Sequence, residues 1–303
     1  MNLNIYNQLI QIIDKERVLI DEPMKKHTTF RVGGNADYFV MPRTIREVQQ
    51  VVALCKNENL PYYILGNGSN LLVGDKGYRG VIIQIYKEMN EITVEGECIR
   101  AQAGALLSKV GSVALEAELA GFEFAAGIPG AVGGAVVMNA GAYGGEMKDI
   151  LASATVLTED GRILTLKNEE LELGYRTSIV VKKNYIVLEA VYHLQRGNKA
   201  EIRAKMDELK IQRVTKQPLE YASAGSTFKS PEGYFAGKLI QDAGLRGFQV
   251  GGAQVSEKHC GFVINKGDAT AADIVELMRQ VSEKVYQEFG VTLEPEVIFI
   301  GDF

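Results

Sequence analysis

Cysteine and histidine are both scarce, with three of each in 303 residues. The cysteines, Cys55, Cys98 and Cys260, are odd in number, far apart and without a CxxC spacing. This pattern argues against a disulfide framework and against a zinc site, so we expect each thiol to be a small buried hydrophobic group. Three scattered histidines form no ligand constellation, and no metal is expected.

Clusters of basic residues are also absent. The net charge is −5 and lysine and arginine are scattered, which leaves no electrostatic footprint for nucleic acid or for an anionic membrane. The N-terminus has no basic region followed by a long apolar run and a small-residue cleavage site. We therefore expect no secretory signal and a cytoplasmic location.

One uncharged stretch, residues 124–145, is long enough to span a bilayer. It holds seven glycines and Pro129 but only one isoleucine and no leucine, so both its helix propensity and its membrane transfer energy are poor. We expect a buried glycine-rich loop here, and no membrane insertion.

The remaining composition is that of a globular α+β protein. Hydrophobic residues make up 46% and charged residues 23%, and the length favours two or three domains. Thr44 and Glu47 form a capping-box pattern before an apolar face that recurs with helical spacing. Asp160-Gly161 between two alternating runs is a strong hairpin signal. Helices are expected over 44–57, 106–119, 197–216 and 270–289, and strands over 60–65, 71–73, 80–85, 91–104, 152–167, 185–195, 261–265 and 291–301.

Two glycine-rich segments, the first of which follows a strand-like run, could hold phosphate groups, because glycine lets backbone N–H groups approach an anion closely. "GNGSN", residues 66–70, lacks the third glycine of a Rossmann fingerprint. "GYFAGKL", residues 233–239, is one residue too short for a Walker loop, so ATP hydrolysis has no support. The second segment, residues 121–145, holds eight glycines. Two such segments in one domain suggest a long ligand with two anchoring points, such as a pyrophosphate between two rings.

Six motifs occur in order along the chain: "HTTFRVGGNADYFV", "LGNGSNLLV", "GIPGAVGGAVVMNAGAYG", "GYRTS", "AGSTFKSP" and "LEPEV". Together they closely resemble the UDP-N-acetylenolpyruvoylglucosamine reductases of bacterial cell-wall synthesis, from about residue 27 to the C-terminus. The resemblance implies a vanillyl-alcohol-oxidase-type FAD-binding fold of two subdomains and a C-terminal α+β substrate-binding domain. We place these at 1–75, 76–196 and 197–303.

The resemblance also implies an activity. NADPH would reduce a non-covalently bound FAD, which would reduce the enolpyruvyl group of UDP-N-acetylglucosamine enolpyruvate to give UDP-N-acetylmuramate for peptidoglycan. The implied FAD-binding residues lie in the two glycine-rich segments. They are Leu65, Gly66, Asn67, Gly68, Ser69, Asn70, Gly127, Ile128, Pro129, Gly130, Gly133, Gly134, Asn139, Gly141 and Ala142.

Reduction of an enol ether requires a fixed cation for the charge that develops towards the carboxylate, and a proton donor for the α-carbon. Arg176 in "GYRTS" matches the family's arginine, whose planar guanidinium can grip a carboxylate with two hydrogen bonds. Ser226 in "AGSTFK" matches the proton donor. Glu296 in "LEPEV" matches the third catalytic residue, which would polarise the carboxylate or relay the proton.

Lys216, Lys229 and His259 fall where the family contacts substrate. Ile298 stands where some members have arginine, and "GYRTS" passes into a strand without the inserted tyrosine loop of other members. The sequence therefore does not identify the residues that bind the UDP group, and the candidates are Tyr143, Tyr175, Arg213 and Arg246.

Two other readings stay open. A sugar or aldonolactone flavin oxidase of the same superfamily would react with oxygen and ignore NADPH. A non-catalytic nucleotide-sugar-binding module would tolerate replacement of Arg176, Ser226 and Glu296, although function must be argued from the site and not from the fold. No apolar heptad or exposed stripe demands association, so a monomer is expected.

Overall fold

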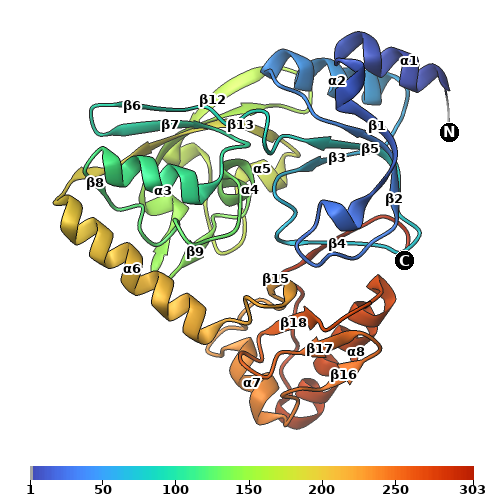
Figure 1. Ribbon diagram of the computed structural model, residues 1–303, viewed down its shortest axis with the longest axis vertical. Coiled ribbons are helices and arrows are strands. Elements are labelled where there is room, and N and C mark those ends of the chain that lie inside the picture. Colours follow the sequence, from blue (N-terminus) through green and yellow to red (C-terminus); the bar gives the residue numbers. More distant parts are fainter. Residues whose placement is uncertain (1–2) are drawn as a thin grey trace. The chain divides into compact units, whose positions relative to one another are not determined.

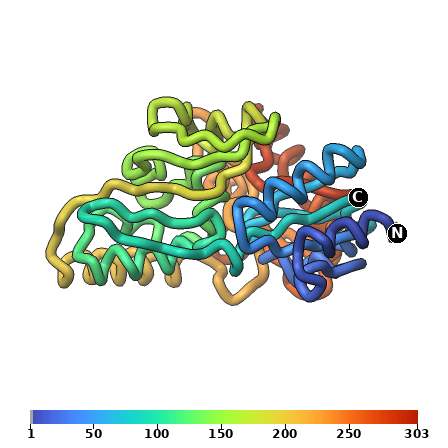
Figure 2. The backbone as a smooth tube through the Cα atoms, turned by 90° about the horizontal axis from the view of Figure 1, so that it is seen from above, coloured from blue at the N-terminus to red at the C-terminus, as the bar shows by residue number. Residues whose placement is uncertain are grey.

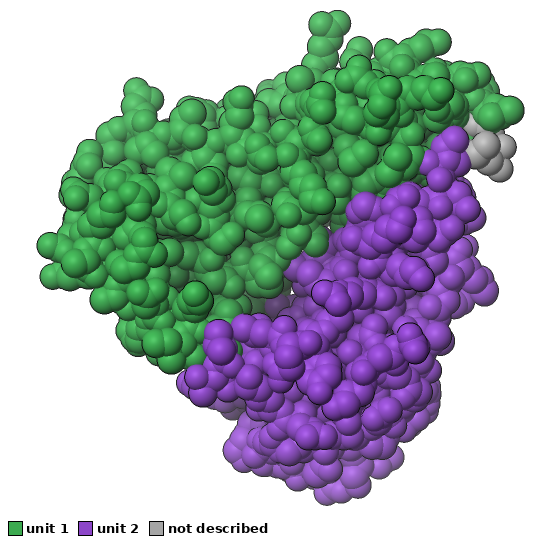
Figure 3. Space-filling view, in the orientation of Figure 1, with its two compact units in different colours: residues 1–19, 38–67, 81–213 green, residues 20–37, 68–80, 214–303 purple. Residues whose placement is uncertain are grey.

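The protein is described by a computed structural model that covers residues 3–303. The chain forms two compact units (Figure 3). Unit 1 consists of residues 1–19, 38–67 and 81–213, and unit 2 of residues 20–37, 68–80 and 214–303. Two short N-terminal segments therefore belong to the same unit as the C-terminal part of the chain. The three-domain division expected from the sequence stays a prediction, and the units are described below one at a time.

A five-stranded antiparallel sheet organises much of unit 1. Its strand order is β12-β11-β13-β7-β6. Helices α3 and α4 pack on β7, and α4 also packs on the central strand β13 (Figure 1). The β6–β7 hairpin is the teal loop in Figure 2. The elements are β6 (Ile92–Glu95), β7 (Cys98–Gln102), α3 (Leu107–Glu116), α4 (Val132–Val137), β11 (Leu151–Leu157), β12 (Ile163–Lys167) and β13 (Ile186–His193).

A second sheet of four strands has the order β1-β2-β5-β3, and β1, β2 and β5 each contain residues of both units. Its strands β3 and β5 pair in parallel, with Leu65 opposite Gln84. Helices α1 and α2 pack on each other. The elements are α1 (Leu3–Ile12), β1 (Val18–Pro23), β2 (Asn35–Val40), α2 (Ile45–Asn57), β3 (Tyr62–Leu65) and β5 (Tyr78–Gln84).

The long helix α6 and several short elements complete unit 1. They are β8 (Leu119–Ala120), β9 (Gly141–Ala142), β10 (Gly145–Glu146), α5 (Ile179–Lys182), β14 (Gln195–Arg196), α6 (Lys199–Lys216) up to Arg213, and the 3₁₀ turns Lys15–Arg17, Met147–Asp149 and Asn168–Glu170.

Helix α2 confirms the prediction made from its cap and its periodicity. The Thr44 side chain accepts from the backbone N–H of Glu47, and Val48, Val51 and Cys55 of the apolar face are fully buried. The reciprocal half of the expected capping box was wrong. The Glu47 carboxylate instead accepts from the Arg43 backbone N–H at 2.6 Å and from the Arg17 guanidinium at 2.9 Å, because an ionic partner is available.

The predicted hairpin at Asp160-Gly161 is confirmed, with a longer loop than two residues. The Thr158 N–H donates to the Arg162 carbonyl and the Gly161 N–H to the Thr158 carbonyl. Gly161 has a φ of +85°. The loop is therefore residues 159–161, a three-residue turn that ends in a left-handed glycine.

The prediction of a glycine-rich loop over 124–145 was only partly right, because the stretch contains helix α4. Its sequence "VGGAVV" has poor helix propensity and no side-chain cap. The helix forms because its first N–H groups find carbonyl partners elsewhere: Val132 donates to Ala105 and Gly133 donates to Ala103. Val132 and Val136 are fully buried, so tertiary packing outweighs propensity here.

Unit 2 is built on a four-stranded antiparallel sheet with the order β15-β18-β17-β16, and helix α8 packs on β16, β17 and α7. Helix α8 confirms the helix expected over 270–289: Thr270 and Asp273 form a capping box at its start, and it ends at Gly290 with a φ of +67°. Strand β19 pairs in parallel with β4. The elements are β4 (Leu71–Val73), β15 (Ala222–Ser226), α7 (Ala236–Asp242), β16 (Gln249–Val250), β17 (Ala253–Val255), β18 (Phe262–Asn265), α8 (Ala271–Phe289) and β19 (Ile298–Ile300), with the 3₁₀ turn Met24–Lys26.

Two of the three thiols meet the expectation of burial. Cys55 and Cys260 are buried, whereas Cys98 is half-buried with its Sγ 3.7 Å from His193 Nδ1. Burial raises the pKa of Cys55 to about 12, so that thiol is unreactive. Among residues 3–303 no group of side chains could hold a metal ion, and no helix is long and apolar enough to cross a membrane.

Candidate functional site

In unit 1 the structure brings the two glycine-rich segments together. The Asn67 side-chain amide donates to the Pro129 carbonyl at 2.9 Å. A Cβ added to Gly66 would lie 3.6 Å from the Cβ of Ala131, which is ordinary contact. The segments 65–67 and 127–134, separated by 60 residues in sequence, are therefore neighbours, as a ligand with two anchoring points requires.

The second segment packs against residues 103–107 at Gly130 and Gly133 and is open at Gly134. The Gly130 carbonyl accepts from the Leu107 N–H, and a Cβ on Gly133 would lie 3.1 Å from the Cβ of Ala103. Gly134 is exposed, and an added Cβ there would meet nothing within 4 Å. Gly133 therefore permits close packing, and Gly134 leaves backbone open to a ligand.

A cation lies beside this segment. Arg213 Nε is 3.0 Å from the position of a Cβ on Gly127, and the Arg213 guanidinium lies 5.7 Å from the centroid of the Tyr143 ring. Burial lowers the pKa of Arg213, because a charged group loses hydration there. A bound anion would offset that cost. The open glycine backbone and the partly buried guanidinium together fit a diphosphate-containing cofactor such as FAD.

The rest of the first segment, residues 68–70, lies in unit 2, where Gly68 and Asn70 make contacts within the protein. Gly68 has a φ of +62°, and a Cβ there would lie 2.0 Å from the His27 carbonyl oxygen, so only glycine fits. The Asn70 side-chain amide donates to the Glu296 carbonyl at 3.0 Å. Ser69 is half-buried. The predicted cofactor role of these residues stays a prediction, and the observed contacts of Asn70 are with the chain that carries Glu296.

Arg176 lies in unit 1 on a tight turn, residues 174–177. The Gly174 N–H donates to the Thr177 carbonyl at 3.0 Å, and the Thr177 N–H donates back at 3.3 Å. Arg176 itself has a φ of +55°, the conformation that a type II turn requires at its third residue and that normally selects glycine. A non-glycine residue held in this region marks stored strain, which concentrates at functional sites. The Arg176 guanidinium lies 5.1 Å from the centroid of the exposed Tyr175 ring.

The Asn139 side chain is hydrogen-bonded to the first residue of this turn. Its side chain is 1% exposed, and its amide donates to the Glu146 carboxylate at 2.6 Å and to the Gly174 carbonyl at 3.1 Å. Its carbonyl oxygen accepts from the Lys148 N–H at 2.9 Å. Both amide hydrogens of Asn139 are thus used inside the protein. The neighbouring Gly141 and Ala142 form β9, which pairs with β10.

Glu146 is a neighbour that the sequence reasoning missed. Hydrogen bonds from Lys148 and Asn139 and the nearby charge of Arg176 lower the pKa of Glu146, so this carboxylate stays ionised near the turn. No spacing in the sequence links residue 146 to residue 176, because the connection depends on the tertiary contact through Asn139.

In unit 2 the structure brings Ser226 and Glu296 onto adjacent extended segments. The Glu296 N–H donates to the Thr227 carbonyl at 2.9 Å, and Phe228 forms a bridge with Pro295. Ser226 is exposed, whereas the next residue, Thr227, is fully buried with its hydroxyl accepting from the Val263 N–H at 2.9 Å. The three predicted catalytic residues are therefore divided, with Arg176 in unit 1 and the other two in unit 2.

A β-bulge aims Ser226. Ser223 pairs with Ile264 and Ser226 with Phe262, so β15 uses one more residue than β18 between these pairs. Gly225 has a φ of +79°, and an added Cβ would have nothing within 4 Å. A left-handed glycine at a bulge redirects the following side chain, and bulges are frequent beside active sites.

His259 lies on the segment next to Ser226. The Thr227 N–H donates to the Gly261 carbonyl, and the Gly261 N–H donates to His259 Nδ1 at 3.1 Å. The ring packs edge-on to Phe262 at 5.0 Å. Burial and the charge of Arg246 lower the pKa of His259. A neutral ring that accepts at Nδ1 carries its proton on Nε2, so His259 is a hydrogen-bond donor.

The two predicted substrate lysines differ in environment. Lys229 forms an ion pair with Glu294 at 3.2 Å, and its N–H donates to the Glu294 carbonyl. Lys216 is exposed at the end of α6.

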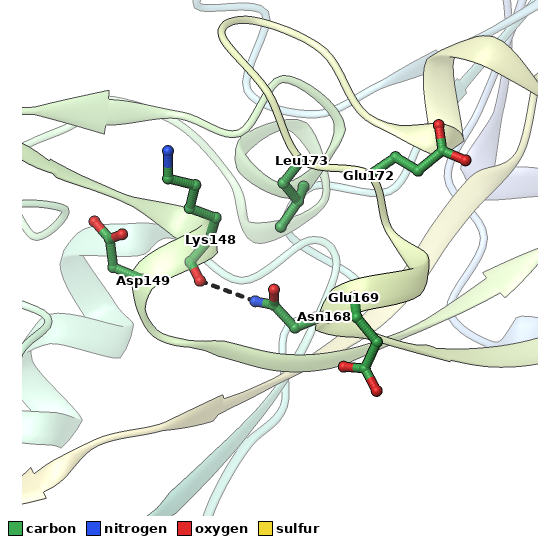
Figure 4. Close-up of a pocket in the computed structure, with 6 residues that line it drawn as sticks. All are labelled: Lys148, Asp149, Asn168, Glu169, Glu172 and Leu173. Carbon is green, nitrogen blue, oxygen red and sulfur yellow. Dashed lines mark hydrogen bonds between the residues drawn. The ribbon is translucent and has the colours of Figure 1, made fainter.

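A pocket of about 460 Å³ in unit 1 is lined by Leu173, which precedes the Arg176 turn, and by Lys148, but by none of the predicted site residues (Figure 4). Three carboxylates and one ammonium group line it, and Asn168 donates to the Lys148 carbonyl at 2.9 Å. This charge balance does not suit an anionic cofactor or substrate. Its lining residues are Lys148, Asp149, Asn168, Glu169, Glu172 and Leu173.

Comparison with known proteins agrees with the geometry. Residues 36–167 match the family model described as FAD binding domain, and residues 217–300 match the model described as UDP-N-acetylenolpyruvoylglucosamine reductase, C-terminal domain. The reductase of Agathobacter rectalis is 56% identical over all of both chains, and that of Clostridioides difficile is 54% identical over 99% of each.

Solved structures extend this result to the fold. The crystal structure of UDP-N-acetylenolpyruvylglucosamine reductase from Thermus caldophilus has a TM-score of 0.80 and 37% identity, covering 94% of this chain and 98% of that one. p-Cresol methylhydroxylase, at 15% identity and a TM-score of 0.51, covers 97% of this chain and 65% of that one and shares only the fold. The fold is the expected FAD-binding domain of the vanillyl-alcohol-oxidase type with an added C-terminal domain. The chain belongs to the UDP-N-acetylenolpyruvoylglucosamine reductase family.

Proposed function

We propose that Arg176, Ser226 and Glu296 carry out the reaction of this family in this chain. The reaction is the NADPH-dependent reduction of the enolpyruvyl group of UDP-N-acetylglucosamine enolpyruvate to UDP-N-acetylmuramate, a step of peptidoglycan precursor synthesis. The observation that supports the assignment best is the hydrogen bond from the Glu296 N–H to the Thr227 carbonyl at 2.9 Å. It sets Glu296 beside the strand that presents Ser226.

The two glycine-rich segments of unit 1 would hold FAD. Gly134 leaves backbone open, and Arg213 beside Gly127 supplies positive charge for a diphosphate. When bound, FAD would accept a hydride from NADPH and deliver it to the β-carbon of the enolpyruvyl group. The protein has to bind the substrate, stabilise the charge that then develops and supply a proton.

Arg176 would stabilise the negative charge that moves towards the substrate carboxylate. A guanidinium binds a carboxylate through two parallel N–H groups and stays charged at any physiological pH. The turn that carries it is fixed by hydrogen bonds at both of its ends. A cation that is already in place needs no reorganisation when the charge appears, which is the condition for electrostatic catalysis.

Ser226 would donate the proton that the α-carbon receives. A serine hydroxyl is a weak acid, so the step depends on the strongly basic enolate-like carbon formed after the β-carbon has been reduced. The bulge at Gly225 exposes the hydroxyl. Glu296 would polarise the substrate carboxylate or help to return the proton to Ser226.

Three further residues are proposed to contact the substrate. Lys216 and Lys229 would meet its phosphate or carboxylate groups, and the neutral His259 ring would donate from Nε2. The monomeric state and the cytoplasmic location expected from the sequence remain predictions.

An anaerobic visible absorbance titration tests the proposal. The purified protein should show the yellow flavin spectrum, lose it on addition of NADPH and regain it only with UDP-N-acetylglucosamine enolpyruvate. A flavin spectrum that returns with oxygen but not with the enolpyruvate would indicate an oxidase. A protein that binds no added FAD would contradict the proposal.

A further inference from the structure

The turn that carries Arg176 is attached to the end of helix α4 at two places. Asn139 Nδ2 donates to the Gly174 carbonyl at 3.1 Å, at the start of the turn. The Ser178 hydroxyl donates to the Val137 carbonyl at 2.6 Å, just after the turn ends. Both side chains are buried, with 1% of Asn139 and none of Ser178 exposed.

The hydrogen bonds of the Asn139 side chain allow only one arrangement of this attachment. Asn139 has a φ of +43°, uses both amide hydrogens, and accepts the Lys148 N–H at its oxygen. Its second acceptor, Glu146, is itself held by Lys148 Nζ at 2.9 Å. A buried polar group satisfied on all sides permits one arrangement, because any alternative would leave an unpaired donor or acceptor.

The attachment matters because the turn opposes a conformational preference. Arg176 is held at a φ of +55°, which costs an ordinary residue free energy relative to extended or helical backbone. Without outside support, a turn of four residues closed by two hydrogen bonds would relax and move the guanidinium. Displacement of a catalytic group by about 1 Å can reduce a rate by up to about 10²-fold.

We propose that Asn139 and Ser178 are positioning residues that lock the Arg176 turn to the end of helix α4. This assignment rests on the proposed role of Arg176. It gives the Asn139 side chain a function other than contact with the cofactor. Because α4 follows Gly130 and includes Gly133 and Gly134, the segment proposed to hold FAD and the turn that carries the catalytic cation form one rigid piece of unit 1.

The test is single-turnover reoxidation of the NADPH-reduced enzyme by saturating UDP-N-acetylglucosamine enolpyruvate. Asn139→Ala should slow this step about 10-fold, with FAD content and reduction by NADPH unchanged. Ser178→Ala should have a smaller effect in the same direction. In resting enzyme, both variants should speed hydrogen exchange of the Thr177 amide, a readout independent of turnover.

Asn168→Ala is the matched control. Asn168 also donates to two backbone carbonyls, those of Lys148 and Leu151 at 2.9 and 2.6 Å, and its side chain therefore bonds to neither Asn139 nor the residues of the turn (Figure 4). It should lose a comparable amount of stability and keep the wild-type reoxidation rate. If Asn139→Ala reoxidises as fast as Asn168→Ala, the positioning role is wrong.

A double-variant comparison separates this inference from the proposed function. Asn139→Ala should add nothing to Arg176→Ala, because a positioning residue acts only through the group that it positions. Losses that multiply would overturn the positioning role. If Arg176→Ala alone reoxidises normally, the proposed function of Arg176 fails, and the inference fails with it. If Asn139→Ala loses FAD, the same comparison of single and double variants is made with Ser178→Ala in its place, and its result decides whether the positioning role holds.

Discussion

Glu296 is held beside Ser226 by its backbone on both sides. Its N–H donates to the Thr227 carbonyl at 2.9 Å, and its carbonyl accepts from the Asn70 side chain at 3.0 Å. Its side chain therefore projects from a fixed backbone next to the strand that presents the serine. The position of the Glu296 backbone beside β15 therefore does not depend on a flexible loop.

The bulge at Gly225 should be needed for catalysis more than for folding. The Cβ added by Gly225→Ala has no atom within 4 Å, but it lies on backbone with a φ of +79°. Holding alanine in this conformation costs about 1 kcal/mol of stability. Rotation of the peptide before Ser226 would relieve this strain and turn the serine away. Reoxidation of the reduced enzyme by substrate should slow about 10-fold. Gly233→Ala, with a φ of +76° and equally open space, should lose similar stability and keep its rate. Equal rates in both variants would show that the bulge does not aim the serine.

Arg176 should show a separation of stability from activity. Arg176→Gly relieves the strain of a φ of +55°, so thermal unfolding should show stability within about 1 kcal/mol of wild type. The substrate half-reaction should slow by on the order of 10² or more, because the charge-stabilising cation is gone. Glu118→Gly, at an exposed position with a φ of +56°, should leave that half-reaction intact. Normal reoxidation in Arg176→Gly would remove the arginine from the mechanism.

The buried Arg17–Glu47 pair should be important for unit 1. Burial raises the pKa of Glu47, but bonds from Arg17 and from the Arg43 amide outweigh it, and the net pKa is lowered. Glu47→Ala leaves Arg17, 7% exposed, without its main partner, and should destabilise the protein by about 3 kcal/mol in denaturant unfolding. Glu288→Ala breaks the exposed pair with Lys284 and should change little. A small effect at Glu47 would mean that solvent reaches Arg17.

The lowered pKa of His259 predicts a pH dependence of stability. In the unfolded chain this histidine takes up a proton below its ordinary value of 6.5, whereas the folded chain resists protonation because the ring is buried. The unfolded state therefore binds more protons, and stability falls as the pH drops below 6.5 towards the lower folded value. Between pH 7.5 and 5, wild type should lose more stability than His259→Gln. Parallel stability curves would contradict the burial of the ring.

Local signals in the sequence were sufficient for helices α2 and α8, whereas α1 was not predicted and the catalytic residues remain predictions. Helices α2 and α8 carry caps and apolar faces that act within a few residues, and the structure confirms both. Helix α4 was missed because its stability comes from carbonyl groups at Ala103 and Ala105. Helix α7 was missed as well, since it has seven residues and no capping side chain.

The asparagines show where motif-based prediction stops. Asn67, Asn70 and Asn139 were all predicted to bind the cofactor, yet the observed partners of their side chains are the carbonyls of Pro129, Glu296 and Gly174. A motif records that an amide is needed at a position but not which group it contacts. Those partners are up to 226 residues away, so only the folded chain shows them.

The most direct test is anaerobic stopped-flow mixing of NADPH-reduced enzyme with UDP-N-acetylglucosamine enolpyruvate, monitored by return of the flavin absorbance. Ser226→Ala should slow this return by on the order of 10² or more, and Glu296→Gln should slow it too, while both reduce normally with NADPH. The control Ser223→Ala, on the same strand as Ser226, should match wild type. Wild-type reoxidation in Ser226→Ala would contradict the assignment of this serine as the proton donor.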